Sequence, residues 1–157
     1  MCLTRAIKIT PGKDLTVYKV LRVSKFKDEF KPEAYYSPYF SETNWIVGKR
    51  KSLNVDSPDI KLGDMWENTV VEGNAFHSFH TYARAKEEAL YCVSLTKSVM
   101  ADGTYAICEC TIPKDSRFVY RGRCDRGISY ASSDLVLNRI CDYFSTYNSA
   151  YKIYEND

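Results

Sequence analysis

The chain has 157 residues, of which 45% are hydrophobic and 27% charged, and its 22 basic and 20 acidic side chains give a formal net charge of +2. This length predicts one domain, residues 1–157, that buries roughly 70% of the surface its unfolded chain would expose. The composition excludes a disordered protein, and the near-neutral charge argues against general nucleic-acid binding, which needs a strongly basic surface.

The beginning of the chain lacks the continuous apolar segment and small-residue cleavage site of a secretory signal. No stretch approaches the roughly 18 apolar residues that cross a membrane. The spacings of His77 with His80 and of Cys108 with Cys110 match no common structural zinc site. We therefore expect a soluble, cytoplasmic protein without a metal, whose six cysteines are free thiols and mostly buried.

In the first half of the chain, short and long extended segments are predicted at 7–9 and 15–24. Alternation in the second segment places Lys19 on one face with the aliphatic residues Val17, Leu21 and Val23. Residues 26–40 are typical of a long loop rich in tyrosine, and we expect this loop to cover a binding site. Residues 45–48 and 51–55 predict a hairpin or two short strands.

The segment 70–95 contains both histidines. Gly73 and Asn74 predict a turn, 75–80 an extended segment, and Thr81 the N-cap of a helix from 82 to about 94. Ala85, Ala89, Leu90, Cys92 and Val93 are expected to face inward, and Arg84, Lys86, Glu87 and Glu88 outward. The positive end of the helix dipole then lies beside the histidines, which favours binding of an anion.

Later strands are predicted at 104–112, 117–122 and 128–140, the last one a strand or a strand that runs into a helix. In 104–112 the face that begins at Ala106 is apolar, so it faces the core and Glu109 faces away. Arg121 and Arg123 make part of one strand face cationic. The polar tail 148–157 is expected to fray. The predicted fold is α+β: a twisted, mostly antiparallel sheet with one principal helix and long loops.

A set of cations, hydroxyl groups and aromatic rings offers what a nucleotide-type or phosphorylated ligand needs. His80 and the helix N-terminus would meet phosphate, tyrosines would stack on a base, and Arg121 would pair with a second anion. The alternative is that these side chains are solvated strand ends. The expected ligand-binding residues are Lys19, Tyr36, Tyr39, His77, Ser78, His80, Arg121, Tyr130 and Ser132.

The order of these elements resembles, in outline, the ADP-ribosyltransferase-like superfamily. Residues 17–20 are similar to its first strand, which has an aromatic residue followed by Arg or His, and 72–79 with the Ala-rich helix are similar to its glycine, aromatic-small-aromatic strand and helix. Residues 105–113, 117–120 and 129–132 also fit. The resemblance implies an alternative function, an enzyme that uses NAD as cofactor with Lys19, His77 and Glu109 as its polar core.

Position 19 is lysine where that family places Arg or His, and neither a Ser-Thr-Ser triplet nor a closing Glu-x-Glu pair is present. The chain also resembles short uncharacterised proteins of bacteriophages and of Bacteroides-type gut bacteria, which often act on host defence. The preferred hypothesis is a phage-related protein that binds and sequesters a nucleotide-type defence signal, without catalysis or a cofactor, and that can form a homo-oligomer. A third hypothesis is a protein-interaction module that inhibits a host protein.

Overall fold

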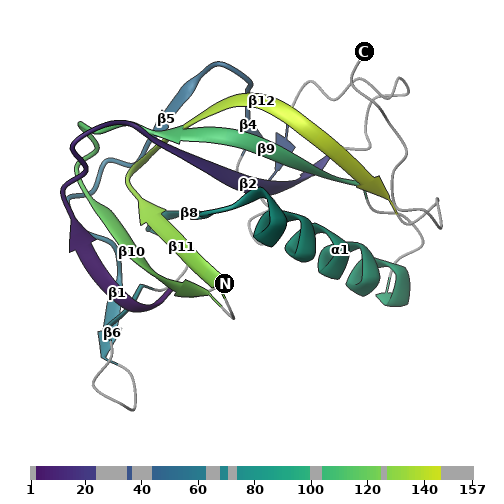
Figure 1. The fold of residues 1–157 in the computed structure, drawn as a ribbon, viewed down its shortest axis with the longest axis horizontal. Coiled ribbons are helices and arrows are strands. Elements are labelled where there is room, and N and C mark those ends of the chain that lie inside the picture. The colour runs from purple at the N-terminus through teal and green to yellow at the C-terminus, as the bar shows by residue number, and fades with distance from the viewer. Residues whose placement is uncertain are drawn as a thin grey trace.

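A curled, mostly antiparallel sheet with one helix against it dominates the computed structural model (Figure 1). The structure describes residues 3–23, 35–36, 44–62, 68–70, 74–99, 104–124 and 127–145. The tail 148–157 and most of the loop predicted at 26–40 lie outside these residues. The elements in chain order are β1 (Thr4–Ile9), β2 (Leu15–Val23), β3 (Tyr35–Tyr36), β4 (Asn44–Trp45), β5 (Arg50–Ser52), β6 (Ile60–Leu62), β7 (Asn68–Val70), β8 (Phe76–Phe79), α1 (Tyr82–Val99), β9 (Thr104–Ile112), β10 (Val119–Cys124), β11 (Gly127–Ser132) and β12 (Asp134–Ser145).

The main sheet has the strand order β1-β10-β11-β8-β2-β9-β12-β5, and β6 and β7 form a separate two-stranded sheet. The strand pairing is shortest at the centre of the main sheet, where β2 and β8 pair only through Tyr18 and Phe79. On its other side β2 pairs with β9 along the whole of Leu15 to Arg22. We call the pairing of β2 with β8 the seam. It divides the sheet into a first half-sheet (β1, β10, β11, β8) and a second half-sheet (β2, β9, β12, β5).

Helix α1 covers one face of the second half-sheet and packs against β2, β9 and β12 (Figure 1). Thr81 caps it as predicted, because the Arg84 N–H donates to the Thr81 hydroxyl at 3.3 Å. The helix ends at Val99, five residues after the predicted end. The prediction that Glu88 is exposed is wrong: its exposed fraction is 6%. Position 88 lies three and four residues from the buried positions 85 and 92, so it belongs to the inward stripe.

The opposite face carries the largest apolar cluster, built from β2, β9 and β12 together with Trp45 and with Phe76, Val119 and Tyr130 of the first half-sheet. The predicted apolar face of 104–112 is confirmed, since Ala106, Cys108, Cys110 and Ile112 are fully buried. Tyr105 and Ile107, on the Glu109 face, are buried as well, because that face packs under α1. Both sides of β9 are therefore in the core. Within the described residues, no helix combines the length and apolar character that a membrane crossing requires.

Three local predictions need correction, and one that left two possibilities open is decided. Residues 35–36, expected in a loop, form β3 between β2 and β4. Of the hairpin or two short strands predicted at 45–48 and 51–55, the structure has two short strands, β4 and β5, which do not form a hairpin, because β4 pairs with β3 and β5 pairs with β12. The strand predicted at 117–122 begins and ends two residues later, and 128–140 is neither one strand nor a strand and helix but parts of β11 and β12. In each case long-range pairing decides where the strand lies.

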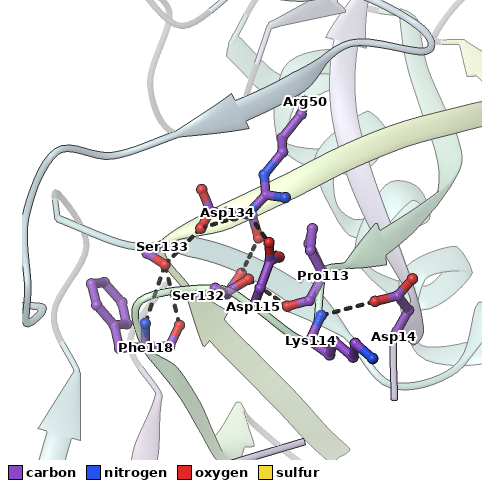
Figure 2. Close-up of polar contacts among 10 residues, drawn as sticks. Asp14, Arg50, Pro113, Lys114, Asp115, Phe118, Ser132, Ser133 and Asp134 are labelled. Atoms are coloured by element: carbon purple, nitrogen blue, oxygen red, sulfur yellow. Dashed lines mark hydrogen bonds and ion pairs between the residues drawn. The ribbon is translucent and has the colours of Figure 1, made fainter. Parts of the chain in front are cut away.

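A buried polar corner at Ser133 separates β11 from β12 (Figure 2). The Phe118 N–H donates to the Ser133 hydroxyl at 3.2 Å, and that hydroxyl lies 3.1 Å from an Asp134 carboxylate oxygen. Arg50 contacts Asp134 at 3.4 Å. Burial acts to raise the pKa of Asp134, but hydrogen bonds from Ser52, Ser133 and Arg50 outweigh it and hold the pKa below its usual range. At this corner the chain crosses from β11 of the first half-sheet to β12 of the second.

Candidate functional site

A row of directly opposed residues crosses the sheet on the face opposite to α1. Cys108 pairs with Lys19, Ser78 with Tyr130, and Tyr130 with Arg121. Continuing the Tyr18–Phe79 register by one residue places Lys19 opposite Ser78 across the seam. Directly opposed residues point to the same face, so four predicted site residues lie side by side. We call this set the polar row: Lys19, Ser78, Tyr130 and Arg121.

Lys19 bridges the seam from a buried position. Its exposed fraction is 7%, and its ammonium group donates a hydrogen bond of 2.7 Å to the carbonyl of His77, which lies in the other half-sheet. The ammonium also lies 5.5 Å from the centre of the Trp45 ring, and that ring packs on Phe76 at 5.0 Å. Phe76 shares its face with Ser78 by strand alternation. The contacts of Trp45 thus confirm that Lys19 and Ser78 are on one side of the sheet.

Two buried polar groups near this bridge have no hydrogen-bond partner among the described residues: the Ser78 hydroxyl and the Trp45 indole N–H. Ser78 is fully buried. A buried polar group without a partner costs about 1–3 kcal/mol of stability. Such groups are rare in folded proteins, and a ligand that accepts or donates a hydrogen bond is one explanation for them.

A second row runs parallel to the first, two residues further along the strands. The His80 N–H donates to the Ile128 carbonyl at 3.1 Å, and Ile128 pairs with Arg123. The Tyr130 hydroxyl joins the two rows through a contact of 3.2 Å to Nδ1 of His80. His80, Arg121 and Arg123 are exposed, unlike Tyr130, whose exposed fraction is 5%. We call the three exposed side chains around Ile128 the cationic patch: His80, Arg121 and Arg123.

The remaining predicted site residues lie elsewhere. The His77 side chain points to the same face as Phe79, toward α1, and only its backbone carbonyl meets Lys19. The Ser132 hydroxyl donates to the Asp134 carbonyl at 2.9 Å within the polar corner (Figure 2). The backbone of Tyr36 belongs to β3, and Tyr39 lies outside the described residues.

The residues suggested for a transferase do not share a site. Lys19 is opposite Cys108 on β9, so its neighbour Glu109 points to the other face. There Glu109 forms an ion pair of 3.0 Å with Arg139. The interpretation of Lys19 and Glu109 as one polar core is therefore wrong, because β9 separates them.

The thiols beside Lys19 are unsuited to nucleophilic chemistry. Burial raises the pKa of Cys108 well above its ordinary value and that of Cys110 to about 12, although the charge of Lys19 opposes both shifts. At neutral pH both groups are therefore protonated. As predicted, the described cysteines are free and mostly buried. In the described part of the chain, no three His, Cys, Asp or Glu residues form a group that could hold a metal ion.

Comparisons of the chain with protein-family models, with curated proteins and with solved structures find no match. Function is therefore inferred from the chemistry of the two rows. Sequence reasoning named six residues that contribute atoms to this region, since His77 supplies its carbonyl, but it did not name Trp45 as a site residue. No local signal marks Trp45, because its role depends on contacts with Lys19 and Phe76 from other strands.

Proposed function

We propose that the protein binds a nucleotide-type ligand on the face of the sheet opposite to α1 and holds it without transforming it. The observation that carries the proposal is the polar row, in which a buried Ser78 hydroxyl without a partner among the described residues lies between Lys19 and Tyr130. Hydroxyl and ammonium groups donate to the carbonyl and ring-nitrogen acceptors of a base. Arg121, at the exposed end of the row, donates to phosphate.

Binding alone is a sufficient activity for this arrangement. The thiols beside the row are protonated, and the carboxylate of Glu109 lies on the opposite face, so among the described residues the row offers donors and rings but no thiolate or carboxylate base. Sequestration of a nucleotide signal needs no more than this. We therefore propose sequestration as the biological role, in keeping with the phage-related character expected from the sequence.

A protein-interaction module is the second candidate, because α1 exposes two large apolar side chains, Tyr91 and Leu95. They lie four residues apart and hence on one face of the helix. An exposed pair of this kind is often part of a contact surface.

Ligand retention tests the proposal. The protein is incubated with a pool of ATP, ADP, NAD, ADP-ribose and cyclic oligonucleotides, separated from unbound compounds by gel filtration, denatured and analysed by mass spectrometry. An unaltered nucleotide in near-stoichiometric amount is the expected result. Cleaved NAD would instead support the transferase alternative, and the absence of any retained nucleotide would refute nucleotide binding.

Two arginine variants locate the site once a ligand is found. Arg121→Ala removes a charged donor of the polar row and is expected to weaken binding by roughly tenfold or more, because hydrogen bonds to charged groups contribute about 1.5–3 kcal/mol. Arg117→Ala is the matched control: this side chain is exposed and pairs with Asp56 at 3.3 Å, before β10 begins. It should leave the affinity unchanged, whereas equal losses in both variants would place the ligand elsewhere.

A further inference from the structure

The first half-sheet carries charges of one sign. Its strands β1, β10, β11 and β8 contain no Asp or Glu, although they contain four Arg or Lys residues. The whole chain has a net charge of only +2, so the excess of cations over anions is concentrated here. A cluster of like charges produces a local potential that attracts anions. The four basic residues are Arg5, Lys8, Arg121 and Arg123.

Two of these cations share the face and the neighbourhood of the polar row. Arg121 and Arg123 are two residues apart on β10, so they point to the same side at a spacing of roughly 7 Å. Both side chains are exposed, and neither forms a hydrogen bond or ion pair with any described residue. Their partners on β1 are Ile7 and Thr4, which carry no charge. Among the described residues, none competes with a ligand for the guanidinium donors of the pair.

His80 completes the arrangement from the other side. Ile128 lies between His80 and Arg123, and the Tyr130 hydroxyl holds the His80 ring through its contact with Nδ1. The side chain of Ile128, at the centre of the cationic patch, has no acceptor that could compete with a phosphate. Donor side chains lie on both sides of it. A single phosphate satisfies one arginine fork, whereas two long arginine side chains at this spacing can converge on neighbouring phosphates.

We propose that the cationic patch binds a linked diphosphate, so that the ligand belongs to the nucleoside diphosphate class or carries a longer phosphate chain. This inference rests on the proposed function and specifies its ligand. The phosphates then lie over Ile128, between Arg121, Arg123 and His80, and the nucleoside extends from them in the direction of the polar row. Arg123 selects for the second phosphate, since it is the arginine of the patch outside the polar row.

Calorimetric titration of the full chain with adenosine, AMP, ADP and inorganic pyrophosphate tests this assignment. ADP is expected to bind about tenfold or more tightly than AMP, the effect of one additional charged hydrogen-bonding group. Arg123→Ala should remove this preference and leave the AMP affinity within about threefold of the original, a change below 1 kcal/mol. Pyrophosphate has no base, so its binding to the original protein and the loss of that binding in Arg123→Ala would also support the assignment.

Lys8→Ala is the control, because it removes the same charge as Arg123→Ala from the other face of the sheet. Lys8 lies opposite Tyr120, the neighbour of Arg121, and therefore points away from the cationic patch. If Lys8→Ala reduced the ADP preference as much as Arg123→Ala, general electrostatic attraction would replace the proposed site. Equal affinities for AMP and ADP would refute the diphosphate assignment while leaving nucleotide binding intact. If none of the four compounds binds, the assignment is refuted, and retention of another nucleotide would still support the proposed function.

Discussion

Replacing Lys19 by Met and by Ala separates the role of its ammonium group from that of its aliphatic chain. Both variants lose the 2.7 Å hydrogen bond to the His77 carbonyl, which contributes about 1.5–3 kcal/mol. Both also remove the cost of burying an ammonium group, which is several kcal/mol. These terms oppose each other, so Lys19→Met, which keeps the apolar chain beside Trp45, should leave the free energy of unfolding within about 2 kcal/mol of the original.

Lys19→Ala additionally creates a cavity in the apolar cluster, and it should be less stable than Lys19→Met by about 2–5 kcal/mol, the usual cost of truncating a buried Met to Ala. Urea denaturation followed by circular dichroism measures both free energies. Both variants should lose nucleotide retention. If Lys19→Met were destabilised by more than about 4 kcal/mol, the amine would be an indispensable part of the seam. Retention by a stable Lys19→Met variant would exclude the amine from the binding site.

Three further predictions concern the surrounding fold. A Cβ on Gly122 would lie 2.4 Å from a carbonyl oxygen of β1, so Gly122→Ala should lower the free energy of unfolding, measured by urea denaturation, by about 1–3 kcal/mol. In the control Gly12→Ala the added Cβ meets nothing within 4 Å, and the free energy of unfolding should change by less than about 1 kcal/mol. Similar values for the two variants would contradict the close approach of β1 to Gly122. The folded-state pKa of Asp134 lies below its unfolded value, so its stabilising contribution is present above about pH 4 and is lost as the pH falls through the folded pKa. Asp134→Asn should therefore flatten the acid side of the stability curve measured by thermal melts between pH 2 and 6, and a curve parallel to that of the original protein would argue against the Arg50 and serine contacts. Burial raises the pKa of Cys110 to about 12, so iodoacetamide at pH 8 should alkylate this thiol only after the protein unfolds. Mass spectrometry of tryptic peptides measures the labelling. Rapid labelling of the folded protein would mean that solvent reaches Cys110 on β9.

Strands and the helix with strong local patterns were predictable from the sequence. The alternation in 15–24 and 104–112 corresponds to β2 and β9, because each has a face that packs in the core. Thr81 was recognisable as an N-cap because its hydroxyl serves the backbone three residues away, which is a purely local requirement. The α+β class and the mostly antiparallel sheet followed from these elements, and the structure confirms them.

Strand limits and pairings without such patterns were not predictable. The break at Ser133 depends on Phe118 and Asp134, and the burial of Glu88 depends on how α1 lies on the sheet. Neither property can be read from a short window, since the partners come from distant parts of the chain. The choice between a hairpin and two separate strands for β4 and β5 could not be made for the same reason: each strand pairs with a strand outside that window.

The chemical groups of the site are visible in the amino-acid sequence: a lysine on an apolar strand face, a serine and histidine before a capped helix, and arginines at alternate positions of a strand. Which of these groups meet depends on how the strands pair. Register in this sheet is set by backbone pairing between segments as distant in the chain as Thr4 and Arg123, and a shift of one residue moves every side chain to the other face. The observed register places Lys19, Ser78, Tyr130 and Arg121 in one row on one face of the sheet. The side chains of His77 and Glu109, each one position along its strand, point to the opposite face.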